Sequence, residues 1–248
     1  MDMALQGKVA LVTGGSRRIG AAIVRRLHAA GAGVLIHYRG AESDAAALED
    51  ELNGVRAASV ARIKAELLAP VAPQALIGAA IDRFGRLDVL VNNASTFYPT
   101  AVGSIEAVHW DELVGSNLRA PLFLAQAAAP HLAEARGAIV NVTDIHAERP
   151  LKGYPVYSIA KAGLAALTRA LALELAPDVR VNAVAPGAIA WPEDGQFEPA
   201  ERERILATTP LARIGAPGDI AAAVLLACTM PYVTGQSFAV DGGRSIFL

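Results

Sequence analysis

The chain has 248 residues, of which 53% are hydrophobic and 19% are charged, and its formal net charge at pH 7 is −2. That length suits one α/β domain with a sizeable core, and the small net charge argues against a nucleic-acid-binding or anionic-membrane-binding surface. The single cysteine, Cys228, excludes an internal disulfide and a cysteine-based zinc site, and its apolar neighbours predict a buried thiol.

The N-terminal stretch MDMALQGK lacks the basic and apolar regions of a secretory signal, and the apolar runs of the chain are shorter than a membrane span. His28, His109, His131 and His146 show no metal-ligand spacing. We therefore expect a cytoplasmic protein with no membrane, nucleic-acid or metal partner.

Seven short apolar runs rich in β-branched residues predict strands at 9–12, 33–36, 59–63, 87–91, 138–142, 179–184 and 237–240. Alanine-rich helical patterns lie between them, among them 21–27, 73–84, 120–132, 157–175 and 220–228. Strands that alternate with helices indicate right-handed βαβ units and a mostly parallel sheet covered on both faces. We predict a single α/β domain over 1–248 with a Rossmann-like, doubly wound sheet.

The stretch TGGSRRIG, residues 13–20, joins the first predicted strand to the first predicted helix. Gly14, Gly15 and Gly20 let the backbone approach a pyrophosphate, and the start of the helix offers unpaired N–H groups. An ordinary glycine turn has the same pattern. Arg18 stands where such a loop usually has a glycine.

The second predicted strand leads into His37, Tyr38 and Arg39, with no carboxylate to bind the ribose hydroxyls of NAD. Arg17 and Arg39 suit a 2′-phosphate instead, so the sequence predicts NADP(H) over NAD(H). Taken alone, Arg39 also fits a solvated surface charge.

Tyr157 and Lys161 are four residues apart in a predicted helix, and that spacing places both on one face. An ammonium beside a phenol lowers the pKa of the phenol from about 10, so Tyr157 is predicted to give a proton to a carbonyl or imine at neutral pH. Other predicted strands lead into Asn92-Asn93-Ala94, Thr143-Asp144 and Pro186-Gly187. In open α/β folds ligands bind at this carboxyl edge of the sheet.

The least regular segment, 188–199, follows the sixth predicted strand, and we predict a substrate loop over 188–208. Such a segment late in this kind of fold often covers the substrate, and a plain surface loop is the alternative. Trp191 in this segment is a candidate to close over the substrate, or else to pack locally.

These motifs together resemble the short-chain dehydrogenase/reductase family over essentially the whole chain. The resemblance implies that Tyr157 donates a proton, that Lys161 binds the nicotinamide ribose and tunes Tyr157, and that Asn117 holds a proton-relaying water. It also implies that 237–248 forms part of a homotetramer. The cofactor residues that it implies are Gly14, Ser16, Arg17, Arg18, Ile19, His37, Tyr38, Arg39, Glu66, Leu67, Asn93, Ala94, Ser95, Tyr157, Lys161, Pro186, Gly187 and Ile189.

Three positions depart from the general family pattern: Arg18 replaces a glycine, Asp144 replaces the serine thirteen residues before the tyrosine, and Glu66 replaces an aspartate on the adenine side. Arg18 and Asp144, with His37-Tyr38 and NASTFYPT at 93–100, resemble the pteridine reductase branch.

This closer resemblance implies that Arg18 contacts both cofactor phosphate and pterin, that Phe97 stacks on the pterin, and that Ser95 hydrogen-bonds the pterin or cofactor. Asp144 would polarise Tyr157 or help to place a proton. Two plainer interpretations stay open, in which Phe97 packs in the protein interior and Asp144 caps a loop.

The leading hypothesis is NADPH-dependent reduction of a dihydropterin, with an oxidised pterin or dihydrofolate as further substrates. The alternatives are a ketone or 3-oxoacyl thioester reductase and a non-catalytic NADP(H)-binding protein.

Overall fold

The computed structural model describes residues 4–191 and 198–247. Its centre is a sheet of seven parallel strands in the order β3-β2-β1-β4-β5-β6-β7. The strands are β1 (Val9–Val12), β2 (Gly33–Tyr38), β3 (Val60–Lys64), β4 (Val89–Asn92), β5 (Ala138–Val142), β6 (Arg180–Pro186) and β7 (Ser237–Val240). The predicted parallel, doubly wound sheet is confirmed, with all seven predicted strands present.

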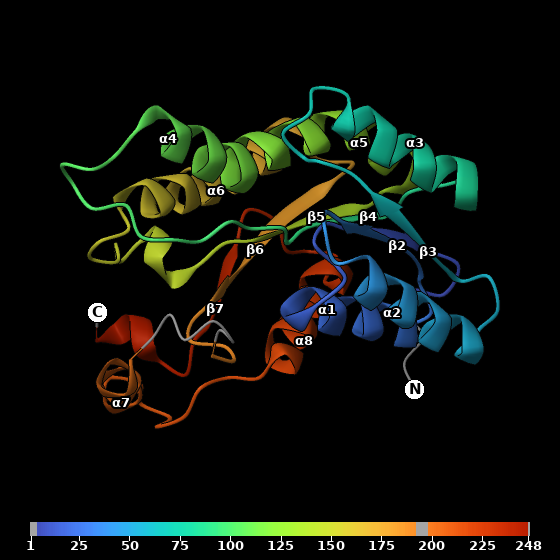
Figure 1. Ribbon diagram of the computed structural model, residues 1–248. Coiled ribbons are helices and arrows are strands. Elements are labelled where there is room, and N and C mark those ends of the chain that lie inside the picture. The colour runs from blue at the N-terminus through green and yellow to red at the C-terminus, as the bar shows by residue number, and fades with distance from the viewer. Residues whose placement is uncertain (1–3, 192–197, 248) are drawn as a thin grey trace.

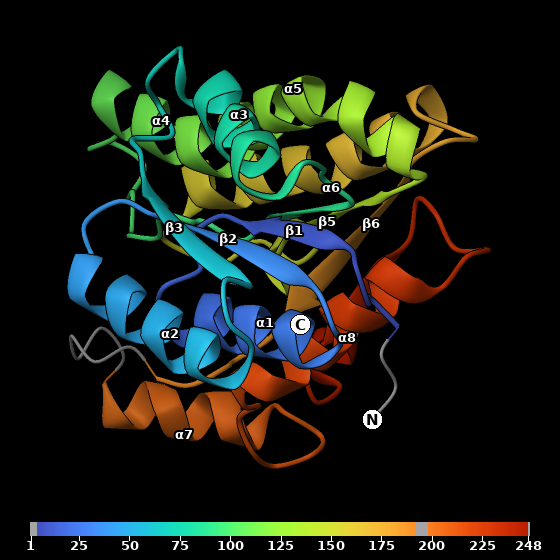
Figure 2. The same ribbon diagram turned by 90° about the vertical axis from the view of Figure 1, so that its right-hand side faces the viewer.

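Helices cover both faces of this sheet (Figure 1). One face bears α1 (Arg18–Ala29), α2 (Glu42–Val55) and α8 (Pro217–Thr229), and the other bears α3 (Ala72–Phe84), α4 (Ala107–Val114), α5 (Ala120–Ala135) and α6 (Pro155–Glu174). Figure 2 shows the two helix layers on either side of the twisted sheet, with α7 (Pro199–Ala207) on the side of α1, α2 and α8. Short helical turns lie at Gly115–Arg119, Ile145–Ala147 and Arg244–Ile246.

The central strands are buried on both faces, which explains why they read as continuous apolar runs rather than as an alternating pattern. In β1, Ala10 and Val12 pack toward α1 and α8, whereas Leu11 packs toward α3 and α5. Cys228 is buried at the end of α8, as predicted.

The segment 188–208 is only partly irregular. Pro199–Ala207 form α7, with Pro199 at its start, Glu201 in the first turn and Arg204 in the last, which are favourable places for these residues. The expectation of a loop is therefore wrong for this part of the segment. Residues 192–197 lie outside the described residues.

Among the described residues, α6 alone is long and apolar enough to cross a membrane. These properties also suit a helix that packs against a sheet. Leu164 and Ala165 are buried on its inner side, and the same side contains Tyr157 and Lys161. The apolar character of α6 therefore has an explanation within the fold.

Candidate active site

A cavity of about 610 Å³ lies along the carboxyl edge of the sheet, a size in the range of small-molecule sites. It is lined by the loop between β1 and α1, by the ends of β4, β5 and β6, by α6 and by α7. Most of the predicted site residues meet here: Gly14, Arg17, Arg18, Ile19, His37, Arg39, Glu66, Leu67, Asn93, Ala94, Ser95, Phe97, Asp144, Tyr157, Lys161, Pro186, Gly187, Ile189 and Trp191.

Three predicted residues do not line this cavity: Ser16, Tyr38 and Asn117. The side chain of Tyr38 is buried in the core between the sheet and α1, α2 and α8. Ser16 is also buried, within the β1–α1 loop. Their predicted cofactor contacts stay predictions.

The β1–α1 loop is held tightly against β4. Asn93 Nδ2 donates to the carbonyls of Thr13 at 2.9 Å and Gly14 at 3.0 Å, and Thr13 Oγ1 accepts from the backbone N–H groups of Asn93 and Ala94. Gly20 has no room for a side chain, because a Cβ there would lie 2.0 Å from the Gly14 oxygen. This close packing of helix on loop is the reason for the glycine at the end of the TGGSRRIG stretch.

His37 has a structural role that the sequence did not reveal. Its Nδ1 accepts from the Gly14 N–H at 3.2 Å, and its Nε2, which then bears the hydrogen, donates to the Ala65 carbonyl at 3.1 Å. Burial lowers the pKa of His37 below its ordinary value, which keeps the ring neutral and fit for both bonds. His37 therefore holds the glycine loop to the end of β3.

Arg18 begins α1 with a φ of 49°, in the left-handed region that glycine usually occupies. Its Nη2 donates to the carbonyl of Ala190 at 2.8 Å. Ala190 also has a positive φ, of 45°. The arginine thus links the glycine loop to the segment that follows β6, and it lines the cavity, as its predicted role requires.

Asp144 makes both of the contacts that the two interpretations from the sequence require. One carboxylate oxygen accepts from the N–H of His146 at 2.8 Å and caps the turn Ile145–Ala147. The other accepts from the hydroxyl of Tyr157 at 2.7 Å. The capping bond fixes the carboxylate in the position from which it binds the phenol.

The pKa of Tyr157 is shifted in the direction opposite to the prediction. Burial raises it well above 10, and the charge of Asp144 and the hydrogen bond to it raise it further, while the Ser95 hydroxyl lowers it in part. Lys161 does not reverse the direction of this shift; its Nζ lies 5.7 Å from the centre of the Tyr157 ring and donates to the Val142 carbonyl at 3.0 Å. Tyr157 is therefore a protonated phenol, the form that a proton donor needs.

The pKa of Lys161 is also shifted by its surroundings. Burial lowers its pKa to about 8, although Asp144 acts in the opposite direction. The lysine thus loses its charge only slightly above neutral pH, which is unusual for this residue type.

Asn117 lies fully buried in the π-helical turn Gly115–Arg119, beneath the cavity wall. Its Nδ2 donates to the carbonyls of Thr96 and Leu113, both at 2.9 Å, and its Oδ1 accepts from the Ser95 hydroxyl at 2.6 Å. Asn117 thus supports Ser95, which does line the cavity.

At the outer end of the cavity, Trp191 and α7 form part of the wall. The guanidinium of Arg202 lies 5.3 Å from the Trp191 ring centre, so Trp191 packs locally while also facing the cavity. The sequence did not single out Thr13, which holds the glycine loop, or the cavity-lining residues Leu151, Arg204 and Arg244. Thr13 begins the glycine stretch and offered a signal, whereas Arg204 and Arg244 reach the cavity only through the fold.

The described residues fit an extended dinucleotide. The cavity is continuous from Arg39 and Glu66 to Tyr157 and Lys161, and it passes the first turn of α1, which has no side-chain cap on its N–H groups. Uncapped N–H groups at a helix start suit a pyrophosphate. A phenolic proton and a lysine then lie at the far end of the same cavity, where a hydride acceptor would need a proton. Among the described residues no group of three His, Cys, Asp or Glu side chains is placed to hold a metal.

Comparisons with known proteins agree with this geometry. The model of a family described as enoyl-(acyl carrier protein) reductase matches residues 14–245. The chain is 37% identical to pteridine reductase 1 of Leishmania tarentolae over 96% of either chain. It is also 37% identical to a 3-oxoacyl-[acyl-carrier-protein] reductase of Synechocystis, over 98% of this chain and 99% of that one.

A third relative is 3beta-hydroxysteroid dehydrogenase 1 of Eggerthella lenta, which is 35% identical over 98% of this chain and 95% of the relative. These relatives differ in the substrates that their names give, but they are oxidoreductases by name and match along nearly the whole chain. The protein is therefore a member of the short-chain dehydrogenase/reductase family, whose enzymes use a nicotinamide cofactor.

Proposed function

We propose that the protein catalyses the NADPH-dependent reduction of a dihydropterin to its tetrahydro form. The observation that carries this proposal is the 2.7 Å hydrogen bond from Tyr157 to Asp144, at the position where the family pattern has a serine. Phe97 and Arg18, the other two residues that suit a pterin, line the same cavity.

The charge of Asp144 favours one kind of acceptor over another. A carboxylate 2.7 Å from the proton donor disfavours a developing alkoxide by like-charge repulsion. A C=N nitrogen is basic enough to be protonated before the hydride arrives, and a nearby carboxylate stabilises the resulting cation. Reduction of a C=N bond therefore fits this site better than reduction of a ketone.

In the proposed reaction, a nicotinamide held beside Tyr157 and Lys161 would supply a hydride to the carbon of a ring C=N bond. Tyr157 gives its phenolic proton to the adjacent nitrogen, so the bond becomes CH–NH. The lysine charge beneath the ring stabilises the resulting phenolate until the tyrosine takes up a proton again. Phe97 provides an aromatic face for the planar ring, and Ser95 a hydroxyl for its polar edge.

The preference for NADPH is part of the proposal. Arg39 lines the cavity just beyond β2, where the sequence provides no carboxylate for the ribose of NAD. Arg17 lies nearby, although it also forms an ion pair with Asp44 at 3.4 Å. We expect tighter binding of NADPH than of NADH, and Arg39→Ala should reduce that preference. Titration of each cofactor at physiological salt tests this, and tighter binding of NADH would contradict it.

A second candidate function is reduction of a 3-oxoacyl thioester. It is favoured by the Synechocystis 3-oxoacyl-[acyl-carrier-protein] reductase, which is as similar to this chain as the pteridine reductase is. A non-catalytic cofactor-binding role fits less well, because the buried Tyr157 and Lys161 are placed as a proton donor and a charge that supports it.

The deciding experiment follows NADPH oxidation by the purified protein with a dihydropterin and, in parallel, with an acetoacetyl thioester. Oxidised pterin and dihydrofolate are run as further substrates. We expect turnover with the dihydropterin and little with the thioester. Turnover with the thioester alone would reject the pterin proposal and leave the fold and cofactor site in place. No turnover with any of them would favour the non-catalytic role.

A further inference from the structure

Phe97 belongs to a group of three aromatic rings at the cavity. Its ring is stacked on that of Tyr154, with centres 4.7 Å apart and planes only 8° from parallel. It also meets the ring of Tyr157 edge-to-face, with centres again 4.7 Å apart and an angle of 72°. Tyr154 therefore covers one face of Phe97, and the catalytic tyrosine contacts it from a second direction.

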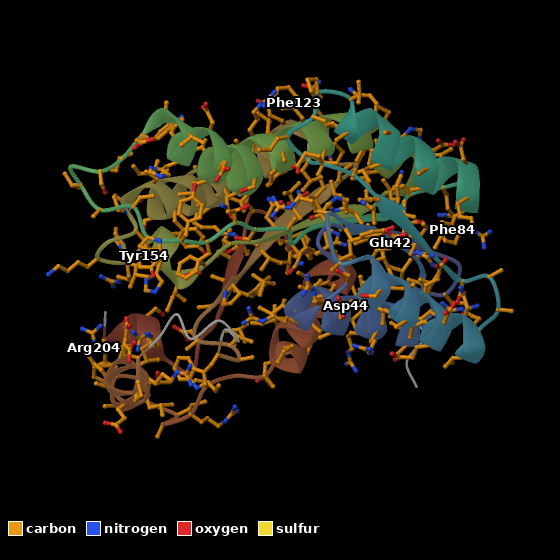
Figure 3. All side chains as sticks on the ribbon, in the orientation of Figure 1. Glu42, Asp44, Phe84, Phe123, Tyr154 and Arg204 are labelled. Carbon is orange, nitrogen blue, oxygen red and sulfur yellow. The ribbon has the colours of Figure 1, made fainter. Side chains whose placement is uncertain are left out.

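Only part of this group faces the cavity. Phe97 and Tyr157 line it, whereas Tyr154 is not among the lining residues of the described chain. Figure 3 shows Tyr154 near the start of α6, across from Arg204 on α7. A planar ring in the cavity can thus stack on Phe97 but meets Tyr154 only through it.

Backbone hydrogen bonds fix the positions of Tyr154 and of the Phe97 segment relative to Tyr157. Tyr154 directly precedes α6 and its carbonyl accepts from the Ser158 N–H, so its position is fixed relative to Tyr157 three residues later. The segment after Phe97 is tied to the same region by a bond of 2.7 Å from the Thr100 N–H to the Gly153 carbonyl. Leu113 and Val156 are buried against the three rings.

A phenylalanine side chain in a connecting segment has several rotamers available to it. A parallel ring packed on one face removes most of them and leaves the opposite face for a ligand. Pre-orienting a contact surface in this way improves binding, because less order has to be imposed when the ligand arrives.

We propose that Tyr154 is a positioning residue that sets the ring plane of Phe97 for stacking on a planar, bicyclic heteroaromatic substrate. The inference rests on the proposed pterin reduction and extends it. It assigns the selectivity for planar substrates to the stacked pair of Phe97 and Tyr154 rather than to Phe97 alone. Tyr154 acts on the substrate through Phe97 and has no part in cofactor binding.

The test is a double-mutant cycle with Tyr154→Leu, Phe97→Ala and the double variant. We expect Tyr154→Leu to raise the KM for the dihydropterin about tenfold, while the Kd for NADPH changes less than about twofold. In the Phe97→Ala background, Tyr154→Leu should change the KM by less than about twofold, since the residue through which it acts is gone.

Two further variants separate the ring from other properties of Tyr154. Tyr154→Phe keeps the stacked ring and should restore a KM near that of the parent protein. Tyr98→Phe is a matched control in the same segment, because its hydroxyl bonds to Glu112 and its ring packs on His109, away from the cavity. Tyr154→Met, a second non-aromatic replacement, serves if the leucine variant does not fold, as judged by NADPH binding and thermal unfolding.

The outcomes distinguish this inference from the function on which it rests. If the parent protein reduces no dihydropterin, both fail. If it does reduce the dihydropterin, three results overturn the positioning role alone. Tyr154→Leu leaves the KM unchanged, its effect on the KM adds independently to that of Phe97→Ala, or Tyr154→Phe raises the KM as much as Tyr154→Leu does. A raised KM that disappears in the Phe97→Ala background supports it.

Discussion

Among single residues, the chemistry of the site depends on where one proton lies between Tyr157 and Asp144. The phenol donates to the carboxylate at 2.7 Å, and burial of Tyr157 disfavours its charged phenolate form. The raised pKa of Tyr157 means that its proton is present across the physiological range. The residue is thus prepared to donate a proton rather than to accept one.

Replacement of Tyr157 by phenylalanine tests this assignment. The variant keeps the ring that packs on Phe97 but lacks the transferable proton, so we expect kcat to fall by about a hundredfold or more. The Kd for NADPH should change little, as measured by fluorescence titration. Tyr232→Phe, at a fully exposed position, is the control. Unaltered turnover in Tyr157→Phe would remove the proton-donor role.

The pH dependence of turnover should report Lys161. Its pKa is lowered to about 8 by burial, so its charge, which supports the phenolate, is lost as the pH rises through that value. Tyr157 does not titrate in this range, because its pKa lies well above 10. We expect kcat/KM to decline above about pH 8 in a profile measured from pH 6 to 10. A profile that stays flat to pH 10 would contradict this role of the lysine charge.

Between elements, the glycine loop owes its shape to contacts with neighbouring strands. Asn93, which follows β4, donates to the Gly14 carbonyl, and His37 in β2 accepts from the Gly14 N–H. The loop is therefore preorganised for a phosphate by bonds to the sheet, in addition to the conformational freedom of its glycines.

His37 should make the stability of this arrangement depend on pH. Its pKa is lowered in the folded protein, so its contribution to stability is present above about pH 6.5 and is lost as the pH falls through the folded value. We expect the free energy of unfolding to decrease between pH 6.5 and 5, and His37→Leu to show a smaller decrease. Denaturant unfolding at several pH values measures this slope.

Replacement of His28 provides a matched control for the replacement of His37. His28 is also buried, its pKa is also lowered by desolvation, and its partner is Ser59, far in sequence from the glycine loop. His28→Leu should reduce the same pH slope but leave the affinity for NADPH unchanged. His37→Leu should weaken NADPH binding, because the Gly14 N–H loses its acceptor. Equal cofactor affinity in the two variants would show that His37 does not organise the loop.

For the whole molecule, one cavity spans the edge of the sheet from the cofactor loop to α7 and the C-terminal turn. Large apolar side chains remain exposed elsewhere, among them Phe123 on α5, Ile159 on α6 and Phe247, which is 69% exposed near the C-terminus. Singly exposed apolar residues are common on monomeric proteins, so the expected association rests on the family resemblance.

We expect a homotetramer, in agreement with the resemblance of 237–248 to the end of family members that assemble in this way. Light scattering should give the mass of four 25.7 kDa chains. Phe247→Asp should lower the mass by weakening one contact, and Tyr232→Phe should leave it unchanged. A monomer at micromolar concentration would contradict the prediction. The cytoplasmic location expected from the sequence stays a prediction.

The sequence by itself determined the architecture, because the patterns that encode it are local. Runs of β-branched residues, glycines between strand and helix, and the four-residue spacing of Tyr157 and Lys161 depend on neighbours along the chain. The parallel order then follows from right-handed connections, and with it the gathering of site residues at the carboxyl edge.

Only the tertiary structure decided the hydrogen-bond partners and the pKa shifts of those residues. The bond from Arg18 to Ala190 joins positions 172 apart, and that from His37 to Ala65 joins positions 28 apart. The pKa of Tyr157 is raised because of its burial and of Asp144, whereas the Tyr157–Lys161 spacing alone predicted a lowered pKa. Hydrogen bonding and desolvation are set by groups that meet only in the folded chain, so no local pattern in the sequence specifies them.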